Sequence, residues 1–74
     1  MPPLPVLSAR EIVAVFERFG WRTARSGNHV VMTREGSNVT LSIPNHREVA
    51  RGTLRSLIRS ANLSVEEFVS ALSE

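Results

Sequence analysis

The fold is decided around a seven-residue stretch, SGNHVVM at residues 26–32. Its second half, from His29 to Met32, is rich in β-branched residues, a composition typical of a strand. Gly27 can take a positive φ without a steric penalty, and Asn28 tolerates that region better than most residues. The stretch therefore predicts that His29 lies where a loop becomes a strand, close to solvent. Such a position suits proton transfer, because an unperturbed imidazole titrates near pH ~6.5. The alternative is an ordinary surface histidine at a strand end.

Strands are predicted on both sides of this histidine. Residues 21–25 form a short β-compatible segment, and residues 29–34 form the second strand. Residues 38–43 alternate cleanly between polar and apolar side chains, as a strand with one buried face does. A short turn at residues 35–37 would join the last two strands in an antiparallel hairpin.

The alternation also predicts which face each side chain takes. We expect Val30 and Met32 to face the core, so that His29 lies on the opposite, polar face of the sheet. In the third strand three side chains are expected on the core side: Val39, Leu41 and Ile43.

The first strand carries a tryptophan and two arginines. Alternation places Trp21, Thr23 and Arg25 on one face, and Arg22 and Ala24 on the other. Trp21 could be a base-stacking platform, but a lone tryptophan beside a helix end is more often a core residue.

The first amphipathic helix is predicted over residues 9–19, where apolar residues recur at helical spacing. Ser8 and Glu11 match a capping box at its start, and Gly20 is well placed just after its end.

Two more helices are predicted after the strands. The first is capped by Thr53 or Gly52, extends to Ala61 and stops at Asn62 in a left-handed conformation. A second capping box, at residues 64–67, opens a short last helix.

The order of helix, three strands, helix and short helix predicts an α+β fold with a three-stranded antiparallel sheet covered on one face by helices. The 74 residues suffice for one domain. We assign residues 8–74 to this domain and the proline-rich residues 1–7 to an extended N-terminal arm. The chain lacks cysteine, a signal-peptide pattern and an apolar run of ~20 residues, so we expect a cytoplasmic protein without membrane contact.

Basic charge is concentrated in two blocks. Nine arginines face seven glutamates, for a net charge of +2. Residues 18–34 hold four arginines and no acid, and residues 47–59 hold four arginines against Glu48 alone. Such blocks point to a phosphate-bearing ligand more than the net charge does. In the second block, Arg51, Arg55 and Arg59 could form a phosphate track, a solvated face, or a surface for an acidic protein partner.

Several motifs, taken in order, resemble the HicA family of toxins. They are Gly-x-His at residues 27–29, Pro-Asn-His at residues 44–46 and Gly-Thr-Leu-Arg-Ser-Leu-Ile-Arg-x-Ala at residues 52–61. The resemblance extends over roughly residues 7–69. It implies an mRNA interferase of a type II toxin–antitoxin pair, with a fold like the double-stranded RNA-binding domain. It also implies a HicB-like antitoxin that blocks the histidine, with the toxin a monomer when free and part of a hetero-oligomer when neutralised.

The resemblance assigns roles to single residues. His29 occupies the place of the family's catalytic histidine, and Gly27 matches its glycine. Asn28 stands where a serine is usual, and Val30 where many members carry a second histidine. His46 matches the later Pro-x-His position.

The residues present also limit the chemistry. The chain has no Cys and no Asp, and its two histidines, without a carboxylate cluster, make a thin metal-ligand set, so we expect no metal or cofactor. RNA supplies its own nucleophile, the 2′-hydroxyl group, so a single general base or acid such as His29 is enough. The candidate RNA-binding residues are Arg22, Arg25, Gly27, Asn28, His46, Arg51 and Arg55. The alternatives are a non-catalytic RNA-binding module of the same fold and a protein-interaction domain.

Overall fold

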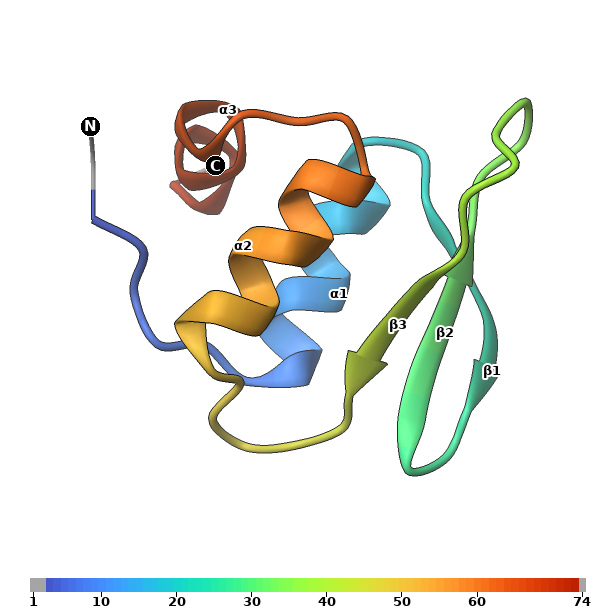
Figure 1. Ribbon diagram of the computed structural model, residues 1–74, viewed down its shortest axis with the longest axis horizontal. Coiled ribbons are helices and arrows are strands. Elements are labelled where there is room, and N and C mark those ends of the chain that lie inside the picture. Colours follow the sequence, from blue (N-terminus) through green and yellow to red (C-terminus); the bar gives the residue numbers. More distant parts are fainter. Residues whose placement is uncertain (1–2, 74) are drawn as a thin grey trace.

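The computed structural model describes residues 3–73. Met1 and Pro2 of the predicted arm, and Glu74 of the predicted domain, lie outside the described residues. The elements follow one another as α1 (Ala9–Arg18), β1 (Arg22–Ser26), β2 (His29–Thr33), β3 (Leu41–Pro44), α2 (Arg51–Ser60) and α3 (Val65–Leu72). The strands form one antiparallel sheet in the order β1-β2-β3. The predicted α+β class, like that of the double-stranded RNA-binding domain, is confirmed. The helices lie together on one side of the sheet (Figure 1).

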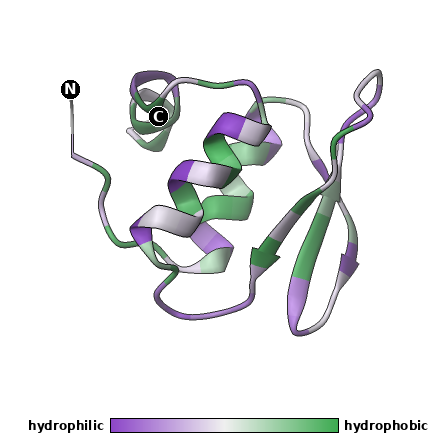
Figure 2. Ribbon diagram, viewed as in Figure 1, coloured by the Kyte–Doolittle hydropathy of each residue, from purple (hydrophilic) through white to green (hydrophobic). Residues whose placement is uncertain are grey.

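The hydrophobic core lies between the helices and the sheet. Figure 2 shows hydrophobic positions concentrated in β2, β3 and the packed helices, whereas β1 is largely hydrophilic. Fully buried side chains come from every helix and from β2 and β3: Ile12, Phe16, Met32, Leu41, Ile43, Leu54, Ile58 and Phe68. Each such side chain contributes roughly 1.5–3 kcal/mol relative to exposure. The core is therefore what holds the sheet against the helices.

Trp21 belongs to this core, which decides between its two predicted roles. The side chain is 2% exposed and meets Phe16 edge-on, with ring centroids 6.5 Å apart. Phe16 in turn packs edge-on against Phe68 at 5.4 Å. A ring so enclosed is not available to stack on a base.

Both predicted capping boxes are confirmed. The Ser8 Oγ accepts from the Glu11 backbone N–H at 3.2 Å, and the Glu11 carboxylate accepts from the Ser8 backbone N–H at 2.9 Å. Ser64 and Glu67 do the same at the start of α3. Gly20, with φ of 91°, follows α1 as expected.

The predicted start of α2 is wrong by two to three residues. The helix begins at Arg51 with Ala50 at its N-cap and has no side-chain cap. A long-range contact sets this start, because Val49 pairs with Leu7 as an isolated bridge and donates its N–H to the Leu7 carbonyl oxygen at 2.8 Å. The predicted left-handed stop is confirmed, since Asn62 has φ of 62°.

The third strand is shorter than predicted. It spans Leu41–Pro44, and residues 38–40 lie outside the ladder. The predicted burial of Leu41 and Ile43 is confirmed, whereas Val39 is 39% exposed. The ladder between β2 and β3 ends at the pair of Met32 and Leu41, so residues 38–40 take no part in it. The connection between β2 and β3 therefore projects beyond the sheet (Figure 1).

The described part of the N-terminal arm is packed against the domain. Leu4 and Leu7 are 3% and 7% exposed, and the Arg51 Nε donates to the Leu4 carbonyl oxygen at 2.7 Å. These two leucines belong to the hydrophobic core of the domain.

Candidate functional site

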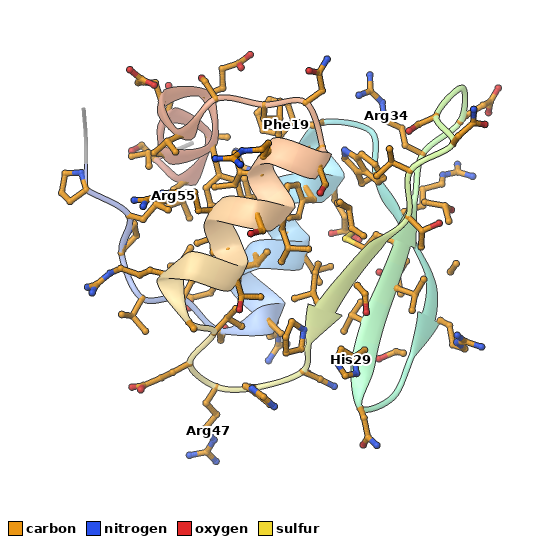
Figure 3. All side chains as sticks on the ribbon, viewed as in Figure 1. Phe19, His29, Arg34, Arg47 and Arg55 are labelled. Carbon is orange, nitrogen blue, oxygen red and sulfur yellow. The ribbon has the colours of Figure 1, made fainter. Side chains whose placement is uncertain are left out.

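The β1–β2 hairpin presents His29 at the first position of β2. A two-residue turn, Gly27 and Asn28, separates the strands, and His29 lies opposite Pro44 of β3. Val30 and Met32 are buried, as predicted, so alternation puts His29 on the sheet face turned away from the helices. The residue is exposed. Figure 3 shows it at the end of β2 beside the hairpin tip.

The turn is fastened by Asn45, which lies in the connection after β3. The Asn45 Nδ2 donates to the Gly27 carbonyl oxygen at 2.9 Å, and the Asn45 backbone N–H donates to the Asn28 carbonyl oxygen at 3.0 Å. Within the turn, the Gly27 N–H donates to the His29 carbonyl oxygen at 3.1 Å. Gly27 and Asn28 do not use the positive φ that their composition allows. A side chain from another segment, rather than glycine flexibility, shapes this turn.

A β-bulge in β1 changes the predicted arrangement of the arginines. Thr23 lies opposite Met32, but Arg25 lies opposite Val31, so the register shifts between Thr23 and Arg25. Side chains directly opposite each other share a face. Arg25 therefore lies on the same face as Val31 and His29, and not on the face of Thr23 as simple alternation predicts. Two residues of the bulged strand oppose one of the partner, which re-aims the side chains that follow.

Arg22 completes a cationic surface on that face. It lies opposite Thr33, whose side chain shares the face of Val31 by alternation. Arg22 and Arg25 thus flank the outer face of the sheet on which His29 is exposed, and the face carries no acidic residue from the three strands. Three of the predicted site residues thus share one face of the sheet, with Arg22 opposite the end of β2 that lies away from His29.

His46 lies near the same end of the molecule, but its backbone rather than its ring makes the observed contact. The Ala9 N–H at the start of α1 donates to the His46 carbonyl oxygen at 3.0 Å. The side chain is exposed. Figure 3 shows Arg47, the next residue, at the end of the molecule where His29 also lies.

Arg51 and Arg55 are not brought to His29. Arg51 is held by the Leu4 carbonyl oxygen, and Arg55 lines a small groove with Ile58, Arg59 and Leu63 on the helical side. Figure 3 places Arg55 on α2, away from the open sheet face. These arginines form a second cationic surface, distinct from the one around His29.

A groove of about 480 Å³ lies between α1 and the β1–β2 hairpin. One wall comes from α1: Arg10, Val13, Ala14 and Glu17. The other comes from the hairpin and the connection that fastens it: Thr23, Ser26, Val30 and Asn45. Two of these residues, Thr23 and Ser26, belong to β1, and all five residues of that strand are exposed.

Sequence reasoning missed the groove and Asn45. Both depend on contacts between segments far apart in the chain, such as the 18-residue separation between Asn45 and Gly27. The one available signal was the spacing of Arg10, Val13, Ala14 and Glu17, which places them on one side of a helix.

No three His, Asp or Glu side chains between residues 3 and 73 gather so that they could hold a metal ion. In the same range, no helix is long and apolar enough to cross a membrane.

The element order α-β-β-β-α-α, with a three-stranded antiparallel sheet, places the chain among small α+β domains of the double-stranded RNA-binding type. A family model described as HicA toxin of bacterial toxin–antitoxin matches residues 9–63, about three quarters of the chain. The chain belongs to this toxin family, and it is a toxin of a toxin–antitoxin pair. Comparisons with curated protein sequences and with solved structures give no match.

Proposed function

We propose that this toxin is an endoribonuclease that cleaves messenger RNA without a metal, with His29 as the general acid or base. The observation that carries the proposal is the exposed imidazole on the open sheet face, which also carries Arg22 and Arg25. Membership of the toxin family supports an RNA-cleaving activity.

The groups around His29 suit an attack by the RNA on itself. His29 takes the proton of a ribose 2′-hydroxyl group, whose oxygen then attacks the adjacent phosphorus and expels the 5′-oxygen of the next nucleotide. The proton held by His29 then passes to the leaving 5′-oxygen, directly or through water, so the products are a 2′,3′-cyclic phosphate and a 5′-hydroxyl end. General acid–base catalysis of this kind contributes typically about 10²–10⁴-fold.

Charge on the phosphorane transition state is stabilised by guanidinium groups. Arg22 and Arg25 are the guanidinium side chains on this face that can stabilise that charge, and Arg25 is on the face because of the bulge. The turn offers fewer free N–H donors to the phosphate than its sequence suggests, because the Gly27 N–H already donates to the His29 carbonyl oxygen. The Asn28 N–H has no backbone acceptor within residues 3–73 and is the donor of the turn that can face a phosphate.

A HicB-like antitoxin is the partner we propose, and it neutralises the toxin by covering the open sheet face. Acidic side chains on the partner would pair with Arg22 and Arg25 there, or with Arg55 and Arg59 on α2. The free toxin is then a monomer in the cytoplasm, and the neutralised form is a hetero-oligomer.

Induced expression of wild type, His29→Ala and His46→Ala tests the catalytic assignment. We expect growth arrest by the wild type and none by His29→Ala. His46→Ala keeps the backbone contact to Ala9 and is expected to arrest growth, with weaker RNA binding. Purified wild type should cleave RNA in the presence of EDTA.

Two other outcomes would favour the alternatives. RNA affinity without cleavage, unchanged in His29→Ala, identifies a non-catalytic RNA-binding module. Weak, salt-independent affinity for RNA identifies a protein-interaction domain, because phosphate contacts make binding salt-dependent.

A further inference from the structure

We propose that the groove between α1 and the β1–β2 hairpin binds an unpaired guanine base of the RNA, one that neighbours the scissile phosphodiester. This inference rests on the proposed function and adds a base-reading site to it. Sequence-specific RNA recognition generally uses unstacked bases held by apolar contact and by hydrogen bonds to their edges.

The α1 wall of the groove is charged at both ends and apolar between them. Arg10, Val13, Ala14 and Glu17 are spaced i, i+3, i+4 and i+7, and all four line the groove. Arg10 and Glu17 are two turns apart, which is about 10.5 Å along the helix axis. No hydrogen bond or ion pair joins their side chains in the part of the chain that the structure describes. A planar ligand can therefore lie between them with both charged groups available.

Guanine matches this order of groups. Its N1–H and N2–H₂ groups can donate hydrogen bonds to a carboxylate such as that of Glu17. Its O6 and N7 atoms can accept hydrogen bonds from a guanidinium such as that of Arg10. Its faces are apolar enough to lie on Val13, Ala14 and Val30. Adenine would turn an acceptor, N1, toward the carboxylate. A pyrimidine has a smaller ring than guanine and would span the two charged ends less well.

The carboxylate also argues against a phosphate in the groove. Glu17 would repel a phosphate group, whereas the outer sheet face carries Arg22 and Arg25 and no acid among its strand residues. We therefore expect the base to lie in the groove, on the α1 side of the hairpin, and the adjoining phosphates to lie on the outer sheet face.

The groove is connected to His29 through the hairpin turn. Ser26 and Val30 line the groove and pair with each other directly beside the turn. Asn45 lines it too, and binds the Gly27 and Asn28 carbonyl oxygens. A strand that leaves its base in the groove and passes around the turn reaches the face where His29 is exposed.

Titration of ¹⁵N-labelled protein with 5′-GMP, 5′-AMP, 5′-CMP and 5′-UMP, followed by NMR, tests the site without any cleavage. We expect GMP to shift the amide signals of Val13, Ala14, Thr23 and Val30, with dissociation constants for the other nucleotides about tenfold higher or more.

Two variants with exposed positions make the test specific. Glu17→Gln should weaken GMP binding about tenfold, whereas the matched control Glu35→Gln, in the turn after β2, should leave it unchanged. Ala14→Trp fills the groove and should abolish the GMP shifts while the rest of the spectrum stays that of the folded protein.

The outcomes separate this inference from the proposed function. Equal shifts by all four nucleotides, shifts outside the groove, or no shifts at all would overturn the guanine site, whatever the nuclease assay shows. If Ala14→Trp weakens antitoxin binding while GMP causes no shift, a protein partner occupies the groove instead. Guanine-selective shifts in a wild-type protein that cleaves no RNA would support the site and overturn the nuclease.

Discussion

Replacing Asn45 by alanine tests whether the hairpin turn must be fastened for His29 to act. Asn45→Ala removes the bond from Nδ2 to the Gly27 carbonyl oxygen, 2.9 Å long, and leaves the backbone bond to the Asn28 carbonyl oxygen, 3.0 Å long. The lost bond is exposed, so it lowers the free energy of unfolding by about 0.5–1.5 kcal/mol. For a domain of this size that loss lowers the Tm by about 2–12 °C.

The effect on cleavage is expected to be larger than the effect on stability. Once the turn is held by one bond, His29 moves relative to the phosphodiester, and a displacement on the order of 1 Å can cost about 10²-fold in rate. We expect kcat for RNA cleavage to fall by about 10- to 100-fold at a temperature where the variant is folded. Urea unfolding followed by the fluorescence of Trp21, the sole tryptophan, shows that it is folded.

Two controls accompany this variant. Asn38→Ala lies in the exposed connection between β2 and β3 and should change neither rate nor stability. Hydrogen exchange of the Gly27 amide, which donates within the turn, should become faster in Asn45→Ala without RNA present. Wild-type cleavage together with unchanged exchange at Gly27 would refute the claim that Asn45 positions the histidine.

Two further predictions concern stability, measured by urea unfolding. Gly20→Ala should cost about 1–2 kcal/mol, because φ is 91° there, whereas Gly27→Ala has open space and ordinary φ and should change stability by less than about 0.5 kcal/mol. Equal losses at the two glycines would contradict the backbone geometry. Ser64→Ala should cost about 1 kcal/mol through loss of the α3 cap, and Ser70→Ala, within the same helix, should cost less; the reverse order would contradict the capping assignment.

Local patterns predicted the parts of the fold that depend on neighbours in sequence. Alternation identified Val30 and Met32 as core residues, and the spacing of Ser8 and Glu11 identified the first cap. These two predictions succeed because strand periodicity and capping geometry each involve residues only two or three positions apart.

Long-range contacts account for what the sequence did not predict. The start of α2 follows from the pairing of Leu7 with Val49, and β3 begins only where its ladder with β2 begins, at the pair of Met32 and Leu41. The bulge that brings Arg25 to the face of His29 is a property of strand pairing, because it exists only where one strand has an extra residue relative to its partner. The composition of residues 21–25 carries no sign of it.

Cleavage of one RNA oligonucleotide in two forms, with ribose or with 2′-deoxyribose at the scissile nucleotide, tests the central claim most directly. With products identified by mass spectrometry, wild type should cut the ribose form to a 2′,3′-cyclic phosphate and leave the deoxyribose form intact. His29→Ala should cut neither. Cleavage of the deoxyribose form, or cutting by His29→Ala at the wild-type rate, would contradict a mechanism in which this imidazole activates the RNA's own hydroxyl group.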